Sequence, residues 1–210
     1  MAQPSRSVSL PIPLYFQPED KAYCGPTAAR MILAYFGIRK SLRAIVSGMP
    51  VSKRHGMFHT ALGEYFLELG FSVTIKLFDP EFRCDFLYLE EPDVNKVIRR
   101  WCAKKPNNRF RASLRYFIDA GGVLIPRPVT EADIRDAMEK KHASILNINP
   151  TLLSGAKREG EWGHYVVPVR LTDSHITVND PACGRMEHLI PNMMLALYRW
   201  SAAGIFISPK

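Results

Sequence analysis

The 210-residue chain lacks the apolar segments that carry a protein into or across a membrane. The N-terminal stretch Met1 to Ser7 has no apolar run after its positive charge, so we expect no secretory signal. No uninterrupted apolar run elsewhere approaches the roughly 20 residues that a membrane-spanning helix needs. Internal repeats and low-complexity segments are missing as well. These absences predict a cytoplasmic protein that does not enter a membrane.

Cysteine is scarce, and no two cysteines have the C-x-x-C spacing of a zinc knuckle. The four are Cys24, Cys84, Cys102 and Cys183. Their scatter also argues against a dense disulfide framework. His55 and His59 lie four residues apart, a spacing that can place two metal ligands on one helix face. Because no glutamate completes a zinc-peptidase pattern and Gly56 disfavours a helix there, we expect no metal and no cofactor.

Acidic residues are missing from one stretch, residues 94–118, which carries eight basic residues. They are Lys96, Arg99, Arg100, Lys104, Lys105, Arg109, Arg111 and Arg115. The preceding residues 79–93 carry six acids against one arginine, so the two stretches partly neutralise each other. We interpret this charged helical segment, at about 79–119, as a solvated surface, with docking of an acidic peptide as the second interpretation. Few aromatic residues are interleaved with the basic ones, which disfavours nucleic acid as a partner.

The composition is that of a folded protein, with 47% apolar residues and a length that suits one domain over residues 1–210. Helical patterns and β-prone runs are distributed unevenly along the chain. We expect helices over 57–69, 94–105, 109–119 and 130–141, and strands over 72–78, 143–149 and 204–208. Helices come first and strands cluster late, which predicts an α+β fold with helices packed on an antiparallel sheet.

The tripeptide Cys24-Gly25-Pro26 begins a run with helical periodicity that ends before Gly37. Proline is favoured in the first turn of a helix and glycine just past the last turn. Cys24 is therefore expected at the amino end of a helix, where unpaired N–H groups and the helix dipole favour an anion. That environment lowers the pKa of a thiol, and a thiolate is the form that attacks a carbonyl carbon. Cys24 is thus a candidate nucleophile.

Two β-prone runs, separated by a turn-like segment, cover residues 164–180. A hairpin centred on Thr172 puts His164 directly opposite Asp180, with Cβ atoms about 4.5–5.5 Å apart. This register needs an odd-length loop or a bulge, because a slip of one residue turns the two side chains to opposite faces. Pro168 cannot donate to the ladder and therefore predicts an edge or irregular strand.

Cys24, His164 and Asp180 are the residue types that an activated cysteine nucleophile requires. Asp180 can orient the His164 imidazole, which takes the proton of Cys24 and later protonates the leaving group. Gln17, seven residues before Cys24, is a candidate for the oxyanion hole together with the Cys24 backbone N–H. The interpretation of Gln17 depends on Cys24 being the nucleophile, since such a glutamine is otherwise a surface or turn residue.

The chain resembles the bacteriocin-processing peptidases from about Leu14 to about Gly184. The matching motifs are Gln17, Cys24-Gly25-Pro26-Thr27-Ala28-Ala29, Tyr35-Phe36-Gly37, Gly163-His164-Tyr165-Val166-Val167, Asn179-Asp180-Pro181 and Gly184. These papain-like cysteine peptidases typically cut leader peptides after a double glycine. The resemblance implies a papain-like fold, in which the N-terminal helix bearing the nucleophile packs on a C-terminal antiparallel sheet. It also implies Cys24 as nucleophile, His164 as general base, Asp180 as orienting acid and Gln17 as oxyanion residue. The family usually has its glutamine six positions before the cysteine, whereas Gln17 lies seven positions before Cys24.

The resemblance implies a cysteine peptidase that hydrolyses a peptide or protein amide through an acyl-thioester, with a leader peptide as one possible substrate. No transporter portion follows, so we expect a free-standing member. The same chemistry suits an amide transferase or a glutamine deamidase. Phytochelatin synthases have a similar start, but their cysteine-rich tail is missing here. A non-catalytic leader-peptide-binding module is the third hypothesis, and the presence of Cys24, His164 and Asp180 counts against it.

Overall fold

The computed structural model describes residues 6–19, 22–49, 57–78, 93–104, 108–154 and 163–210. Its helices are α1 (Cys24–Tyr35), α2 (Leu42–Ser47), α3 (His59–Glu68), α4 (Asp93–Ala103), α5 (Arg109–Asp119), α6 (Glu131–Glu139), α7 (Thr151–Ser154) and α8 (Ile190–Tyr198). Its strands are β1 (Val8–Ser9), β2 (Phe71–Lys76), β3 (Val123–Ile125), β4 (Ala143–Ile148), β5 (His164–Leu171), β6 (His175–Asp180), β7 (Gly184–Leu189) and β8 (Ala203–Pro209). The predicted α+β class is confirmed.

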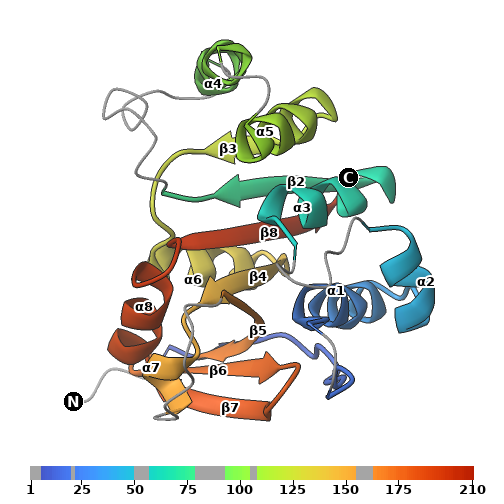
Figure 1. Ribbon diagram of the computed structural model, residues 1–210. Coiled ribbons are helices and arrows are strands. Elements are labelled where there is room, and N and C mark those ends of the chain that lie inside the picture. The colour runs from blue at the N-terminus through green and yellow to red at the C-terminus, as the bar shows by residue number, and fades with distance from the viewer. Residues whose placement is uncertain (1–5, 20–21, 50–56, 79–92, 105–107, 155–162) are drawn as a thin grey trace.

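Within the described ranges, eight strands form one sheet in the order β3-β2-β8-β4-β5-β6-β7, with β1 paired to β5 (Figure 1). The pairs among β4 to β8 are antiparallel, as predicted. At the other edge β2 and β3 are parallel, a pairing that the sequence patterns do not predict. The chain reaches β3 only after passing through α4 and α5, and such a crossover connection returns it in the same direction.

Helix α1 has the start and the end that its sequence predicts. Pro26 lies in the first turn, and Gly37 follows the helix with a φ of +81°, a backbone conformation that favours glycine. The N–H of Ile38 closes the end by donating to Leu33 O at 2.8 Å. The helix buries a small apolar face against β5 and β4. Its fully buried apolar side chains are Ala28, Ala29, Met31, Ile32 and Leu33.

The other helices cover both faces of the sheet. Figure 1 shows α1 and α3 in front of it and α6 behind it. Helix α3 packs on β2 and α5, while α8 packs beside α7 and β4. Helix α6, predicted over 130–141, begins with a reciprocal pair of hydrogen bonds between Thr130 and Asp133 that caps its first turn. None of the described helices combines the length and the apolar character that a bilayer crossing needs.

Candidate active site

Cys24 is the first residue of α1, and the residue before it, Tyr23, makes no side-chain cap. The start of α1 lies close to β5 at Gly25. A Cβ added at Gly25 would lie 3.3 Å from a ring carbon of Tyr165 and 3.1 Å from the sulfur of Met57. Both distances are tighter than ordinary Cβ contacts. The glycine that follows the cysteine therefore allows α1 to approach the strand that carries His164.

His164 begins β5 and Asp180 ends β6, so the two side chains come from neighbouring strands. His164 Nε2 lies 2.8 Å from Asp180 Oδ1, and only about a tenth of each side chain is exposed, 12% and 10%. The same oxygen accepts the backbone N–H of Ala182 at 2.7 Å and of Cys183 at 3.1 Å. With Nε2 directed at the carboxylate, Nδ1 is the nitrogen left for the sulfur of Cys24, which is hydrogen-bonded to His164.

The strand register differs from the one that the sequence predicted. Val167 pairs with Asn179, so continuing the ladder puts Asp180 level with the residue before Val167, two positions along from His164. The prediction that His164 and Asp180 are directly opposite is wrong. The prediction that they share a face is right, since side chains two positions apart point the same way. Pro168 lies next to a bulge, as expected for an irregular strand, although β5 lies inside the sheet.

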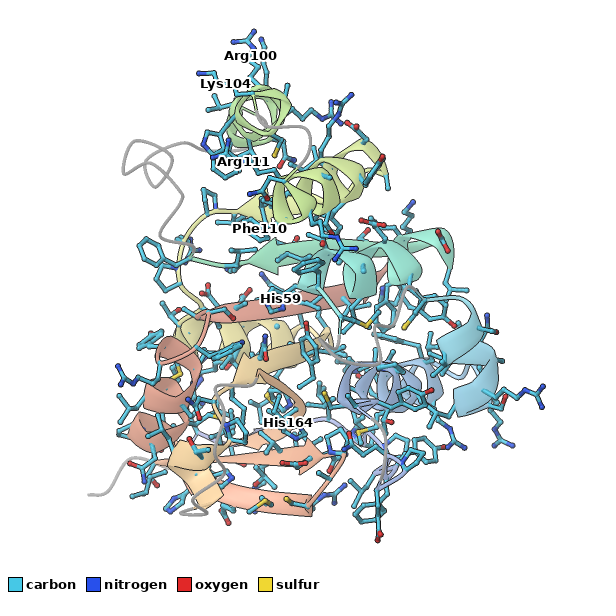
Figure 2. The ribbon with its side chains drawn as sticks, in the orientation of Figure 1. His59, Arg100, Lys104, Phe110, Arg111 and His164 are labelled. Atoms are coloured by element: carbon cyan, nitrogen blue, oxygen red, sulfur yellow. The ribbon has the colours of Figure 1, made fainter. Side chains whose placement is uncertain are left out.

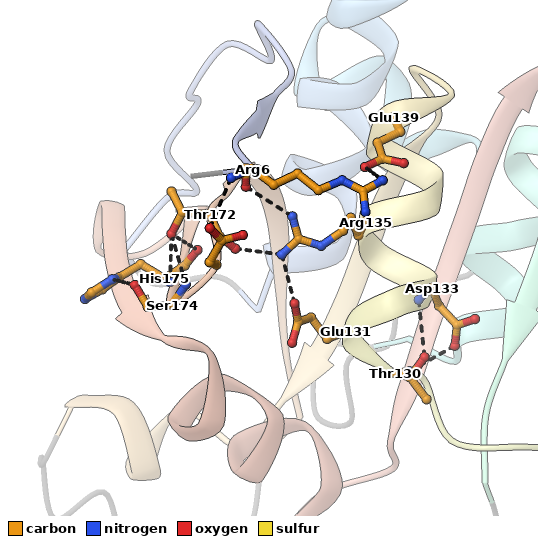
Figure 3. A network of polar contacts seen from close by, with 10 residues as sticks. Arg6, Thr130, Glu131, Asp133, Arg135, Glu139, Thr172, Ser174 and His175 are labelled. Carbon is orange, nitrogen blue, oxygen red and sulfur yellow. Dashed lines mark hydrogen bonds and ion pairs between the residues drawn. The ribbon is translucent and has the colours of Figure 1, made fainter. Parts of the chain in front are cut away.

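The register is set by the turn, which is centred later than on Thr172. Thr172 N–H donates to His175 O at 2.9 Å, and the Thr172 hydroxyl accepts the N–H of Ser174 and of His175. Figure 3 shows how α6 supports this turn: the Arg135 guanidinium donates to Thr172 O at 2.7 Å and to Arg6 O at 3.3 Å. These contacts join the N-terminal segment, α6 and the β5–β6 turn in one network that holds the hairpin in place.

Burial and charge act in opposite directions on the three ionisable groups. Burial raises the pKa of the Cys24 thiol, but the hydrogen bond and charge of His164, with the backbone N–H groups of Tyr165 and Gly25, bring it below its ordinary value. Burial lowers the pKa of His164, while its hydrogen bonds to Asp180 and Cys24 raise that pKa to about 9. Burial likewise opposes ionisation of Asp180, but His164 and backbone N–H groups hold the pKa of that carboxyl low. The arrangement favours a thiolate facing an imidazolium.

Gln17 lies at the same end of the molecule as Asp180. Its backbone N–H donates to Pro181 O at 2.9 Å, which ties the segment before α1 to the turn that follows Asp180. Its side-chain Oε1 is buried and makes no hydrogen bond within the described part of the chain. The described contacts tie Gln17 to the turn after β6 and not to Cys24, so its place in the oxyanion hole stays a prediction.

A buried polar contact beside the site was missed by the sequence analysis. The Tyr165 hydroxyl lies 2.9 Å from His59 Nδ1 and donates to Met57 O at 3.1 Å. Burial lowers the pKa of His59 to about 4, so this imidazole is neutral at pH 7. His55, the possible partner of His59 in a metal site, lies outside the described residues. Among the described residues, no group of three or more His, Cys, Asp or Glu side chains is placed to hold a metal ion. The sequence offers no periodicity that joins residues 59 and 165.

The basic segment is remote from these groups. Figure 2 shows Arg100 and Lys104 pointing outward from α4, at the far end of the molecule from His164. Arg99 and Arg115 both form ion pairs with Asp119 on α5. The acidic residues 79–92 and Lys105 lie outside the described residues, so the expected neutralisation by that acidic stretch stays a prediction.

No family model matches the sequence, and no curated protein matches it. Solved structures do match over nearly the whole chain. One is a double-glycine-motif protease from an AMS/PCAT transporter in complex with the leader peptide, at 13% identity and a TM-score of 0.55, covering 99% of this chain and 100% of that one. Another is a C39-like peptidase from Bacillus anthracis, at 12% identity and a TM-score of 0.57, covering 98% of both chains. The chain has the fold of these peptidases.

A third match agrees with the other two. The peptidase domain of Streptococcus ComA, a bifunctional ABC transporter of a quorum-sensing pathway, aligns at 13% identity with a TM-score of 0.51. The alignment covers 94% of this chain and 98% of that domain. The resemblance inferred from the sequence motifs is therefore confirmed in three dimensions. At this identity the likeness establishes the fold, and the roles of individual residues rest on the geometry of this chain.

Proposed function

We propose that the chain is a cysteine peptidase that hydrolyses a peptide or protein amide, with residues 1–210 forming one peptidase domain. The observation that carries the proposal is the buried His164–Asp180 pair hydrogen-bonded to a thiol of lowered pKa at a helix start. The fold shared with double-glycine peptidases supports the same reaction class. A leader peptide is the substrate class we favour, because the first of these neighbours is a complex with one.

In the first half of the reaction, the Cys24 thiolate attacks the carbonyl carbon of the scissile amide. Negative charge develops on the carbonyl oxygen, where the Cys24 backbone N–H and the Gln17 side-chain amide donate hydrogen bonds. The C–N bond then breaks, and His164 gives its proton to the leaving amine. The product of this half is an acyl-thioester on Cys24.

In the second half, His164 removes a proton from water, which attacks the thioester carbon. The C–S bond breaks and the sulfur leaves as a thiolate, which restores the starting pair with the imidazolium of His164. Asp180 stays ionised throughout, because His164 and the backbone N–H groups of Ala182 and Cys183 all stabilise its charged form. Its role is to hold the ring with Nδ1 toward the sulfur and to stabilise the imidazolium.

A reducing compartment suits this chemistry. Cys24 and Cys102 are free thiols, and burial raises the pKa of Cys102 to about 11, which keeps that thiol inert. We therefore propose that the protein acts in the cytoplasm.

Site-specific alkylation tests the nucleophile. Iodoacetamide at neutral pH should add one carbamidomethyl group first on Cys24, as mapped by peptide mass spectrometry, and Cys102 serves as the internal slow control. His164→Ala should slow the alkylation of Cys24 by at least about tenfold, since the pair with imidazolium is lost. Alkylation of Cys24 no faster than that of a cysteine in a denatured chain would refute an activated thiol.

Product analysis with an added amine then separates hydrolysis from acyl transfer. Binding of a peptide without turnover would favour the non-catalytic leader-peptide-binding module.

A further inference from the structure

An apolar cavity adjoins His164 and Asp180. Its apolar wall comes from four strands, from α7 and from Pro150, the residue before that helix. The main contributors are Ile148, Leu153, Val166, Val178 and Met186. Cys24 is not part of its lining, although His164 is.

The strand pairing explains why the cavity lies across His164 from the nucleophile. Ile148 is the cross-strand partner of His164, and Val178 is the partner of Met186, so all four share one face of the sheet. The next residue along β5, Tyr165, points to the opposite face, where its ring lies close to Gly25 at the start of α1. His164 therefore forms a boundary between the start of α1 and the cavity.

The two charged groups in the cavity wall, His164 and Asp180, are already paired with each other. Asp180 Oδ1 already accepts three N–H groups, from His164, Ala182 and Cys183. His188 also lines the cavity, and burial lowers the pKa of His188, so its ring is neutral at pH 7. Burying an apolar side chain in such a space releases its surface from water and displaces no ion pair.

We propose that this cavity takes an apolar side chain of the residue on the amine side of the scissile bond. The inference rests on the proposed function. His164 delivers a proton to the leaving nitrogen, so this nitrogen lies within hydrogen-bond reach of the imidazole during the reaction. The first side chain beyond that nitrogen is therefore next to His164, whose ring forms part of the cavity wall. The wall favours Leu, Met or Phe over Gly, and disfavours Asp or Glu.

Acyl transfer to added amines probes this subsite without knowledge of the natural substrate. The full-length chain is supplied with acetyl-glycylglycine p-nitrophenyl ester: the Cys24 thiolate bonds to the acyl carbon as the C–O bond breaks, and the leaving phenolate takes the proton of His164 and departs as p-nitrophenol. An amino-acid amide then attacks the thioester carbon, its proton passes to His164, and the thiolate of Cys24 leaves as the new amide bond forms. The measured quantity is the ratio of amide product to hydrolysed acid for each amine.

Leucine amide and methionine amide should capture the acyl group at least about tenfold better than glycine amide, since each buries one apolar side chain. Glutamic acid amide should be the poorest acceptor. Met186→Glu should bring the ratio for leucine amide close to that for glycine amide. Leu153→Glu, from a different element, should do the same, so the result does not depend on the folding of one variant. Leu195→Glu, at an exposed position of α8, is the matched control and should keep the preference.

The outcomes separate the subsite from the chemistry. An acyl-enzyme that transfers equally to leucine and glycine amides, or a preference that survives both wall substitutions, overturns the subsite and leaves the peptidase proposal intact. Ester cleavage that does not depend on Cys24 overturns both.

Discussion

His164 Nε2 and Asp180 Oδ1 lie 2.8 Å apart even though the two residues are two positions out of direct register. The contact is diagonal across the β5–β6 ladder, within the reach of long side chains on one face. Two backbone N–H groups fix the carboxylate from the turn that follows β6. The imidazole is therefore oriented by the sheet and by a turn together, which leaves its other nitrogen for Cys24.

Removing the charge of Asp180 should weaken the nucleophile while keeping its geometry. In Asp180→Asn, the pKa of His164 should fall from about 9 because a hydrogen-bonded carboxylate no longer stabilises the imidazolium. The pKa of Cys24 should rise in turn, because the charge of His164 is one of the causes that lower it. Iodoacetamide alkylation at pH 7 should slow by about tenfold or more. The exposed carboxylate variant Asp136→Asn, which removes a surface pair with Lys140, should alkylate as the wild type does.

The pH dependence of amide hydrolysis should have two limbs with different origins. The pKa of Cys24 is lowered, so the thiolate persists below the ordinary thiol range and activity should extend into mildly acidic solution. The pKa of His164 is raised to about 9, so hydrolysis should fall as pH rises through about 9 and the leaving amine loses its proton donor. Alkylation by iodoacetamide needs no proton donor and should not fall there. A parallel fall of both rates above pH 9 would point to unfolding instead.

Gln17→Ala should separate transition-state stabilisation from thiol activation. Acylation of Cys24 by an ester or amide should slow by about 100-fold, because one donor to the oxyanion is lost. Alkylation by iodoacetamide forms no oxyanion and should be unchanged. Stopped-flow acylation and alkylation of the same preparation give both rates. Equal losses in the two reactions would assign Gln17 a structural role through its backbone contact with Pro181.

Gly25→Ala should displace the start of α1. The added methyl group would lie 3.1 Å from the Met57 sulfur and 3.3 Å from the Tyr165 ring, so the free energy of unfolding should fall by about 1–3 kcal/mol. The alkylation rate of Cys24 should fall as well, since the sulfur moves relative to His164. Gly37→Ala is the matched control: it strains a φ of +81° with open space around it, so stability should fall while the alkylation rate is kept.

Helices with explicit start and stop signals could be predicted from the sequence. The run 109–119 matches α5, the cap at Thr130 matches the start of α6, and Gly70 ends α3 with a φ of +89°. These features depend on short-range hydrogen bonds and backbone preferences, which a local pattern contains. The fold class followed from the same local patterns and their order.

Elements that depend on distant contacts were missed. Strand β7 and helix α8 were not predicted, since only alternate residues of β7 are shielded and α8 is stabilised by packing on α7 and β4. The hairpin centre was misplaced because Arg135, from α6, helps to hold the turn. The role of Gly25 as a close-approach residue also depends on Tyr165, which is far away in sequence.

The ultraviolet absorbance of the thiolate, titrated in the wild type, Cys24→Ala and His164→Ala, tests the pairing of Cys24 with His164 most directly. The difference between wild type and Cys24→Ala should show a thiolate that forms below the ordinary thiol pKa, and His164→Ala should move that transition upward. A difference signal that appears only at or above the ordinary thiol pKa, with or without His164, would contradict the account.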